Sequence, residues 1–323
     1  MPSNKKKRLA LFNNGAFYCL VIILITFGVL SPQFLTLSNL LTVARQTSTV
    51  CVITICSFLA ILTHQTDLSV GATASLTAVV AVHGAVNMGL PVWVACLLAL
   101  LVGLAMGLLN GLLCGYTTIP PFIITLGTMY VGESIGIIIT KGYTIPIADA
   151  AFTWIGAGTV FGMIPVPLIL VVILVCIVSY VLRNRRYGTL LYAVGGNEDA
   201  TLASGVNTRR IKLSVFVING ALATLAGFIL ASRLGSANPS QGMGLELDGI
   251  CAAILGGTAL SGGVGTITGA ILGAITLQLL RNGLNLVGIS SSVQMFLIGV
   301  AIVVILIFDS VCNMIAQRRR KRA

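Results

Sequence analysis

The chain has 323 residues, of which 57% are hydrophobic and 8% are charged, and its mean hydropathy is +1.03. No water-soluble fold can cover this much apolar surface, so the composition excludes a soluble globular protein and requires a lipid bilayer. The formal net charge of +11 does not indicate a nucleic-acid partner, because the basic residues fall in clusters that flank hydrophobic stretches.

Long uncharged stretches follow one another along almost the whole sequence, and they number about ten. Each needs about 20 residues to cross the hydrocarbon as a helix, so no length remains for a separate soluble catalytic domain. We therefore expect one transmembrane domain over residues 1–323. The predicted fold is all-α, a polytopic membrane bundle of about ten transmembrane helices.

The first half of the chain is predicted to cross the membrane five times. The first span is retained and not cleaved as a signal peptide, because no small-residue cleavage site follows Leu30. A short amphipathic segment is then expected on the outer surface, at residues 34–45. The predicted spans are residues 15–31, 48–66, 69–90, 91–115 and 119–140, followed by an outer loop at 141–163.

The second half contains a polar loop and a glycine-rich region. Spans over residues 164–182 and 213–232 flank the polar loop, 183–212, and an outer polar segment then ends near Asp248. Glycines interrupt the next apolar stretch, which predicts short or broken helices near 249–265. Such breaks are tolerated at membrane depth only where protein or a watery cavity satisfies the backbone. A last span is predicted over residues 294–308.

The distribution of basic residues predicts the orientation of the bundle. Three clusters, at residues 5–8, 183–212 and 318–322, hold 15 of the 19 Lys and Arg residues. The positive-inside rule places these clusters, and with them both termini, in the cytoplasm. Threading the spans in order puts the other four basic residues outside: Arg45, Lys141, Arg233 and Arg281. We therefore expect a multi-pass protein of the plasma (inner) membrane.

Two ladders of small residues recur at a spacing of four. One comprises Gly103, Gly107, Gly111 and Gly115, and the other runs from Gly257 through Ser261, Gly265 and Gly269 to Gly273. On a helix this spacing makes a shallow groove into which another backbone fits closely. The groove serves either ordinary packing within the chain, which is the commoner case, or a seam around a pathway or between two copies.

Two carboxylates interrupt the predicted spans, where an ionised group costs a few kcal/mol. Asp67 is expected to cap the helix that follows it, because Asp is a favoured N-cap residue, and the same break is compatible with a substrate path. Glu133 is expected to face other helices or a water-filled cavity. Asn110, Thr125, Asn219 and Gln278 are polar positions that meet either a hydroxylated cargo or a neighbouring helix.

The sequence lacks the motifs typical of metal-binding, catalytic and nucleotide-binding sites. The two histidines and eight cysteines show no metal-ligand spacing, and the cysteines are interpreted as small hydrophobic residues. No nucleophile elbow or zinc-protease motif occurs, so we expect no catalytic residues and no bound metal. A phosphate-binding P-loop is also missing, which places any ATP hydrolysis on another polypeptide.

The polar loop and four other regions together resemble a known family of membrane proteins. The loop contains YAVGGNEDA at 192–200 and ASGV at 203–206. The other four regions, in chain order, are DLSVG at 67–71, LNG at 109–111 with IPPFIITLGTM at 119–129, GLELD at 244–248 with ILGGT at 254–258, and NGLNL at 282–286. These segments resemble the permeases of ribose-type sugar importers of the ATP-binding-cassette class, found in bacterial inner membranes.

The resemblance implies partners. Such permeases work as two copies or two related chains, with a cytosolic ATPase of two nucleotide-binding halves and a periplasmic or lipid-anchored sugar-binding protein. ATP and magnesium are then bound by the ATPase, and this chain needs no cofactor of its own. The resemblance places the ATPase contact in the polar loop, on Gly195, Gly196, Asn197, Glu198, Asp199, Ala200, Ser204, Gly205 and Val206.

Within this docking segment, residues 195–206, the two glycines are predicted to form a tight turn and Asn197 to cap a short helix opened by Glu198 and Asp199. The alternative is that this segment is a solvated connector with no docking role. The candidate substrate pathway comprises Asp67, Ser69, Asn110, Pro121, Phe122, Thr125, Glu133 and Asn219. Asp149, Glu246 and Asp248, in the outer loop and the outer polar segment, are expected to face the binding protein.

The predicted function is therefore passage of a small sugar, by default a ribose-like monosaccharide, through an ATP-driven importer. An ion- or proton-coupled secondary transporter also fits about ten spans with a broken helix. A proton relay needs several carboxylates at matched depth, and the spans offer two, which weakens that alternative.

Overall fold

The computed structural model of the protein describes all residues except 1–14, 291, 298 and 301–323. The described chain contains six helices that are long and apolar enough to cross a membrane, and two shorter apolar helices, α2 (Gly15–Leu30) and α4 (Val70–Val86). The six are α3 (Leu37–Leu62), α5 (Val92–Tyr116), α6 (Pro121–Thr140), α8 (Val166–Asn184), α11 (Thr208–Leu234) and α13 (Ile267–Leu286). The expected all-α membrane bundle is confirmed, whereas most of the last predicted span lies outside the described residues.

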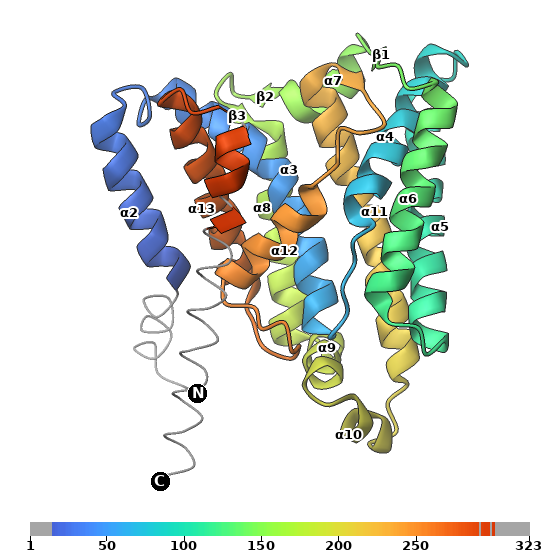
Figure 1. The fold of residues 1–323 in the computed structure, drawn as a ribbon. Coiled ribbons are helices and arrows are strands. Elements are labelled where there is room, and N and C mark those ends of the chain that lie inside the picture. The colour runs from blue at the N-terminus through green and yellow to red at the C-terminus, as the bar shows by residue number, and fades with distance from the viewer. Residues whose placement is uncertain (1–14, 291, 298, 301–323) are drawn as a thin grey trace.

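Four further short helices and two small β-ladders lie in residues 141–255 of the described chain. The helices are α7 (Ala150–Ala157), α9 (Arg186–Gly196), α10 (Glu198–Ala203) and α12 (Leu245–Leu255). Strand β1 (Ile145–Pro146) pairs antiparallel with β4 (Ser236–Ala237), and β2 (Thr159–Val160) pairs antiparallel with β3 (Ile164–Pro165). Figure 1 shows α7 and the strands at one end of the bundle and α9 and α10 at the other.

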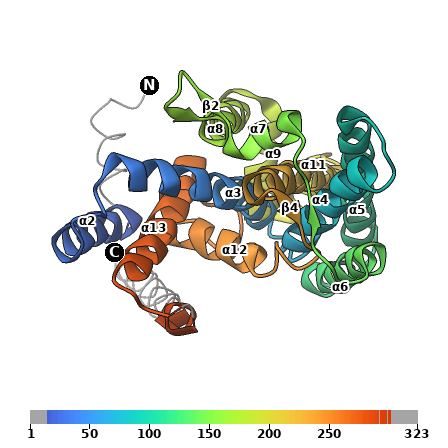
Figure 2. The same cartoon turned by 90° about the horizontal axis from the view of Figure 1, so that it is seen from above.

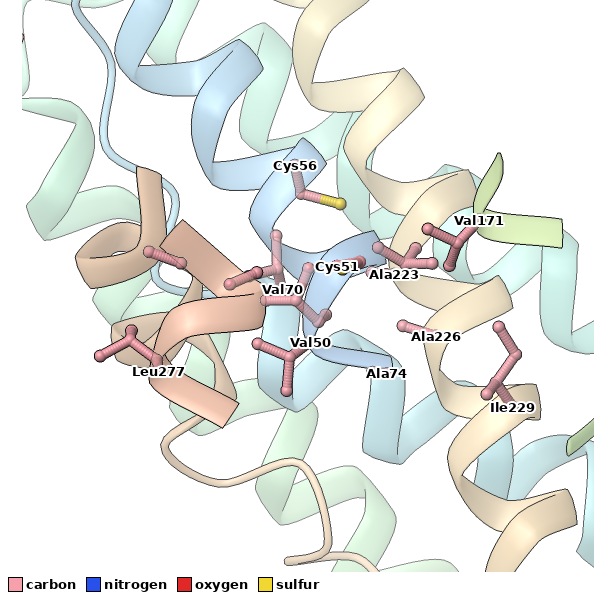
Figure 3. Close-up of a cluster of buried hydrophobic side chains, with 14 of the residues drawn as sticks. Val50, Cys51, Cys56, Val70, Ala74, Val171, Ala223, Ala226, Ile229 and Leu277 are labelled. Atoms are coloured by element: carbon pink, nitrogen blue, oxygen red, sulfur yellow. The ribbon is translucent and has the colours of Figure 1, made fainter. Parts of the chain in front are cut away.

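Helix α3 lies at the centre of the bundle. Every residue from Thr47 to Leu62 is buried, as expected of a helix surrounded by protein on all sides. Seen from above, α2 and α13 lie on one side of α3, and α4, α11, α5 and α6 follow on the other (Figure 2). Small and branched side chains from α3, α4, α8, α11 and α13 meet in a common apolar cluster (Figure 3).

The first glycine ladder packs α5 onto α11. A Cβ atom on Gly103, Gly107 or Gly111 would collide with the backbone of α11, and one on Gly115 would press against it. Close backbone approach is what a small-residue ladder allows in a membrane helix pair. This ladder therefore serves packing within the chain. The second ladder is helical only at its end, where Gly269 and Gly273 on α13 lie against the α12 segment.

The amphipathic segment expected on the outer surface at 34–45 is not separate from the span that follows it. It continues without interruption into the next span as α3, which also ends earlier than predicted, at Leu62. The reason lies in α13: Asn39 and Asn282 exchange two hydrogen bonds of 2.9 Å, and Gln278 donates to Gln46 at 3.0 Å. Side chains of α13 thus provide the hydrogen-bond partners of Asn39 and Gln46.

Two non-helical segments enter the bundle from opposite ends. Residues 63–69 lead from α3 to α4, and residues 238–244 lead from β4 to α12. The two meet where α4 and α12 begin, because the Gly242 N–H donates to the Ser75 hydroxyl at 2.7 Å. The predicted short helix near 249–265 is confirmed as α12, with a loop at 256–266 before α13. The non-helical segment at 63–69, before α4, is a second interruption of the helices within the bundle.

Basic residues separate to the two ends of the bundle in the described chain. Arg233 lies in the last turn of α11. Lys141 is the C-cap residue of α6 and lies close to the β1–β4 ladder, at the same end of the bundle. Helix α11 has 27 residues, so its two ends are about 40 Å apart. Arg209, Arg210 and Lys212 lie at its other end, beside α10. The terminal clusters at 5–8 and 318–322 lie outside the described residues.

Candidate functional site

The break between α3 and α4 places a carboxylate deep inside the bundle. Asp67 is 3% exposed, and its Oδ1 accepts hydrogen bonds from the backbone N–H of Ser69 at 3.0 Å and from the Ser69 hydroxyl at 2.7 Å. Its Oδ2 accepts from Nδ2 of Asn219, on α11, at 3.0 Å. Three donors thus offset the cost of burying a charged group.

The hydrogen-bond network continues to α5 and α6. Asn110 Nδ2 donates to the Ser69 hydroxyl at 2.8 Å, and Thr128 Oγ1 donates to Asn110 Oδ1 at 2.8 Å. Thr125 donates to the backbone oxygen of Thr66 at 3.2 Å. We call these residues the buried polar cluster: Asp67, Ser69, Asn110, Thr125, Thr128 and Asn219. Five of the eight predicted pathway residues belong to it.

Thr128 was missed by the sequence analysis. It follows Thr125 by three residues on α6, a spacing that puts both side chains on one helix face. That spacing alone was the available signal, and many threonines in membrane helices share it by bonding only their own backbone.

The buried polar cluster is closed in this conformation. The void beside Asp67, Asn110 and Asn219 measures about 160 Å³ between atoms and has no room for a water-sized molecule. Asn219 Oδ1 is buried without a partner among the described residues. The cluster therefore joins four segments of the bundle here and does not form an open path.

Asp67 does not cap α4 in the expected way. The N-cap position belongs to Ser69, whose side chain makes no capping hydrogen bond. Asp67 lies two residues earlier and binds Ser69 itself. A short side chain that accepts from the residue two positions on forms an Asx-type turn, so Asp67 shapes the break more than the helix end.

The remaining pathway candidates lie away from the cluster. Pro121 is the first residue of α6, and Phe122 beside it is half exposed. Glu133 lies farther along α6, is half-buried, and has no hydrogen-bond or ion-pair partner in the described part of the chain. The structure does not bring these three together with Asp67, and their assignment to a pathway stays a prediction.

The three residues expected to face the binding protein occupy different surroundings. Asp149 caps α7, accepting from the N–H groups of Ala151 and Phe152 at 2.9 and 3.0 Å. Glu246 is 7% exposed and accepts from the Gly244 N–H at 3.0 Å. Asp248 makes a two-pronged ion pair with Arg281 at 2.5 Å. They do not form one surface, and their role stays a prediction.

The docking segment forms a short helix at one end of the bundle (Figure 1). Asn197 Oδ1 accepts from the Ala200 N–H at 2.9 Å and caps α10, whose first turn contains Glu198 and Asp199, as predicted. Glu198 also pairs with Lys212 on α11 at 2.6 Å. Leu202 is 57% exposed on α10, so the helix presents an apolar side chain beside its charges.

Gly195 and Gly196 do not form the tight turn that we predicted. They are the last two residues of α9, and the chain turns at Asn197. Gly195 lies so close to the Leu62 carbonyl that a Cβ atom there would overlap it. Close packing, not turn geometry, requires this glycine. The left-handed backbone falls instead at Gly205, whose φ is +81°.

A polar groove of about 620 Å³ lies between α10 and the corner that joins α5 to α6. Tyr116 and Thr117 line one wall, and Glu198, Asp199 and Arg209 contribute to the other. The Arg209 guanidinium stacks over the Tyr116 ring at 5.7 Å from its centre, which ties the start of α11 to the end of α5. This groove was not predicted from the sequence, because its walls come from separate parts of the chain.

Comparison with known proteins assigns the family. Residues 39–306 match the profile of the family described as "Branched-chain amino acid transport system / permease component". That match takes in both breaks, the buried polar cluster and the docking segment. The chain belongs to this family. It is a permease component of a transport system and not itself an enzyme.

Similar permeases resemble the chain over nearly its whole length. A Ribose import permease protein RbsC from Haemophilus influenzae is 37% identical over 93% of this chain and 94% of its own. One of the same name from Bacillus subtilis is 40% identical over 91% of this chain and 92% of its own. The D-allose transport system permease protein AlsC of Escherichia coli is 36% identical over 91% of this chain and 90% of its own.

These relatives confirm the resemblance inferred from the five motif regions. No solved structure matched the chain. Membership of a permease family, together with six long apolar helices in the described residues, identifies a multi-pass membrane protein.

Proposed function

We propose that this permease is the membrane-spanning subunit of an ATP-driven importer that carries a ribose-like monosaccharide into the bacterial cytoplasm. One observation carries the proposal: relatives 37–40% identical over more than nine-tenths of the chain are named as ribose import permeases. A sugar-binding protein outside the membrane delivers the cargo. The energy comes from a cytosolic ATPase with two nucleotide-binding halves.

The geometry of the docking segment supports an external ATPase. Helix α10 projects from one end of the bundle and offers Glu198, Asp199 and Leu202 to a partner. The ion pair with Lys212 connects it to α11, which crosses the entire bundle. A partner that displaces α10 therefore displaces a helix that contacts the buried polar cluster through Asn219.

The closed state of the buried polar cluster supports a gating role for it. Asn110 and Asn219 join α5 and α11 to the break at Asp67 and Ser69 by directional hydrogen bonds, so a small rotation of α11 breaks the bond between Asn219 and Asp67. The freed groups then face the cavity in which sugar hydroxyls pass. Two permease chains, identical or related, line that cavity together.

Reconstitution tests the proposed function. Proteoliposomes containing the permease are assembled with its ATPase inside and the binding protein outside, and the uptake of radiolabelled D-ribose is measured. We expect uptake that requires the permease, ATPase, binding protein and Mg-ATP together. Uptake driven by an ion or proton gradient without the ATPase contradicts the proposal and establishes a secondary transporter.

The choice of sugar is tested separately. The binding constants of D-ribose, D-allose and L-arabinose for the binding protein are measured, and each is compared with the corresponding uptake rate. We expect the two orders to agree, because delivery by the binding protein sets the choice. An order of uptake that departs from the order of binding assigns part of the specificity to the permease.

A further inference from the structure

We propose that Tyr192 and Gly195 of α9 are positioning residues that join both broken membrane segments to the docking helix, so that one movement of α10 reaches both breaks together. The proposal rests on the proposed function, because it assigns a task to the movement of α10. It concerns contacts on the inner side of α9, away from the surface offered to the ATPase.

The first contact joins α9 to the end of α3. Leu62 is the last residue of α3, and the break toward Asp67 starts immediately after it. Gly195 packs against the Leu62 carbonyl without space for a side chain. Leu191, one turn earlier on α9, is 1% exposed and packs in the same apolar cluster as Leu62. Any displacement of α9 therefore presses on the start of the first break.

The second contact joins α9 to the loop after α12. The Tyr192 hydroxyl donates to the Gly265 carbonyl at 2.9 Å, and the Gly263 backbone packs against Gly196. Gly263 has φ +69°, and the space beside it admits no side chain. Burial raises the pKa of the Tyr192 phenol, because desolvation disfavours the phenolate.

The two contacts share one point. The Gly263 N–H donates to the Leu62 carbonyl at 2.9 Å, the same oxygen that Gly195 covers. The end of α3, the end of α9 and the loop after α12 therefore meet at the Leu62 carbonyl, where their backbones are in direct contact. On the other side of α12, the Gly242 N–H before that helix donates to the Ser75 hydroxyl of α4, the helix that follows the first break.

The connection from this junction to α10 is short. Asn197 is at once the C-cap of α9 and the N-cap of α10, so a single residue separates the two helices. Because this link cannot lengthen, α10 can rotate about it but cannot move away from α9 without carrying α9 along. The ion pair of Glu198 with Lys212 also passes the displacement to α11.

Removal of one hydroxyl tests this inference with little disturbance of the fold. Tyr192→Phe removes the hydrogen bond to Gly265 and leaves the exposed face of α10 unchanged. Tyr187→Phe is the matched control, since its hydroxyl lies on the same helix but bonds Ser214 of α11 at 2.7 Å, not a broken segment. Both are measured in the complete transporter, by D-ribose uptake and by ATP hydrolysis in the same proteoliposomes.

We expect Tyr192→Phe to keep co-purification with the ATPase and to lower the ratio of sugar transported to ATP hydrolysed about threefold to tenfold. That range corresponds to the loss of about one net hydrogen bond. Tyr187→Phe should leave the ratio unchanged. A structural role alone lowers thermal stability in both variants and leaves the ratio equal in both, and that outcome overturns the proposal.

Gly195→Ala provides a second, stronger variant. If it folds and assembles with the ATPase, uptake should stop; normal uptake at a normal ratio contradicts the inference. The outcomes separate the two proposals. If the unsubstituted complex shows no ATP-dependent sugar uptake, the proposed function fails, whereas normal uptake with an unaffected Tyr192→Phe ratio rejects the junction alone.

Discussion

Asn219 on α11 donates a hydrogen bond to Asp67, 152 positions earlier in the chain, at 3.0 Å. The amide and the carboxylate are each at most 3% exposed. This bond fixes the helix that begins at the docking segment to the break between α3 and α4. Loss of this hydrogen bond should therefore affect both the stability of the bundle and the proposed transport cycle.

Replacement of Asn219 should destabilise the permease. Asn219→Leu keeps a similar volume but removes one donor from the buried Asp67 carboxylate, which should lower the free energy of unfolding by about 1–3 kcal/mol. The midpoint of thermal unfolding in detergent measures the effect. Asn285→Leu, at an exposed position on α13, is the control. Equal midpoints for the two variants contradict this account of the cluster.

The glycine ladder of α5 allows a comparison between two similar substitutions. Gly107→Ala places a Cβ against the Phe216 carbonyl, whereas Gly127→Ala on α6 meets nothing within 4 Å. Overpacking of a close helix contact costs about 1–3 kcal/mol, so the first variant should unfold at a lower temperature. The second should be neutral or more stable by about 1 kcal/mol, because alanine favours the helix. Equal midpoints would show that the α5–α11 contact tolerates separation.

The ion pair of Asp248 and Arg281 should respond to removal of one partner more than to removal of both. Asp248→Asn leaves the guanidinium within the bundle without its carboxylate. Because the Arg281 side chain is 35% exposed, we expect a loss of about 1–2 kcal/mol, less than for a fully buried pair. Asp248→Asn with Arg281→Gln should recover part of that loss. Additive losses in the unfolding midpoints would show that the two residues are not coupled.

Charge reversal on α10 should impair the attachment of the ATPase. Replacing both Glu198 and Asp199 by Lys opposes whatever cationic surface receives them, and we expect recovery of the ATPase in a pull-down to fall at least about tenfold. The fold should persist, because the half-exposed Glu198–Lys212 pair contributes about 1 kcal/mol at most.

Tyr143→Lys is the control for this reversal. It adds a positive charge near the β1–β4 ladder, at the opposite end of the bundle, where the side chain is 75% exposed. Recovery of the ATPase should match the unsubstituted protein. Normal recovery with the reversed α10 would leave the docking segment as a solvated connector.

Most helices were predictable because their signal is local. An apolar stretch long enough to span the bilayer must satisfy its own backbone hydrogen bonds, and a helix does so within the stretch. The cap on α10 was predictable for the same reason, since Asn197 and Ala200 are three residues apart. The break at α12 followed from its glycines.

The predictions were wrong where contacts between residues far apart in the sequence determine the local structure. The segment at 34–45 reads as a surface helix until Asn39 meets Asn282, 243 positions later. Gly195 reads as a turn residue until Leu62 and Gly263 lie against it. Both features depend on the packing of helices that are far apart in sequence, and no local pattern encodes the partner.

Composition and spacing were thus sufficient to predict a membrane bundle, a break near 249–265 and a polar loop at 183–212, because lipid permits few backbone structures and penalises each polar side chain. They also drew attention to Asp67, Asn110 and Asn219 as costly residues. That these three bind one another, and that α9 touches both broken segments, was decided only in the tertiary structure. Side-chain hydrogen bonds need atoms within about 3 Å, and only packed helices bring such residues that close.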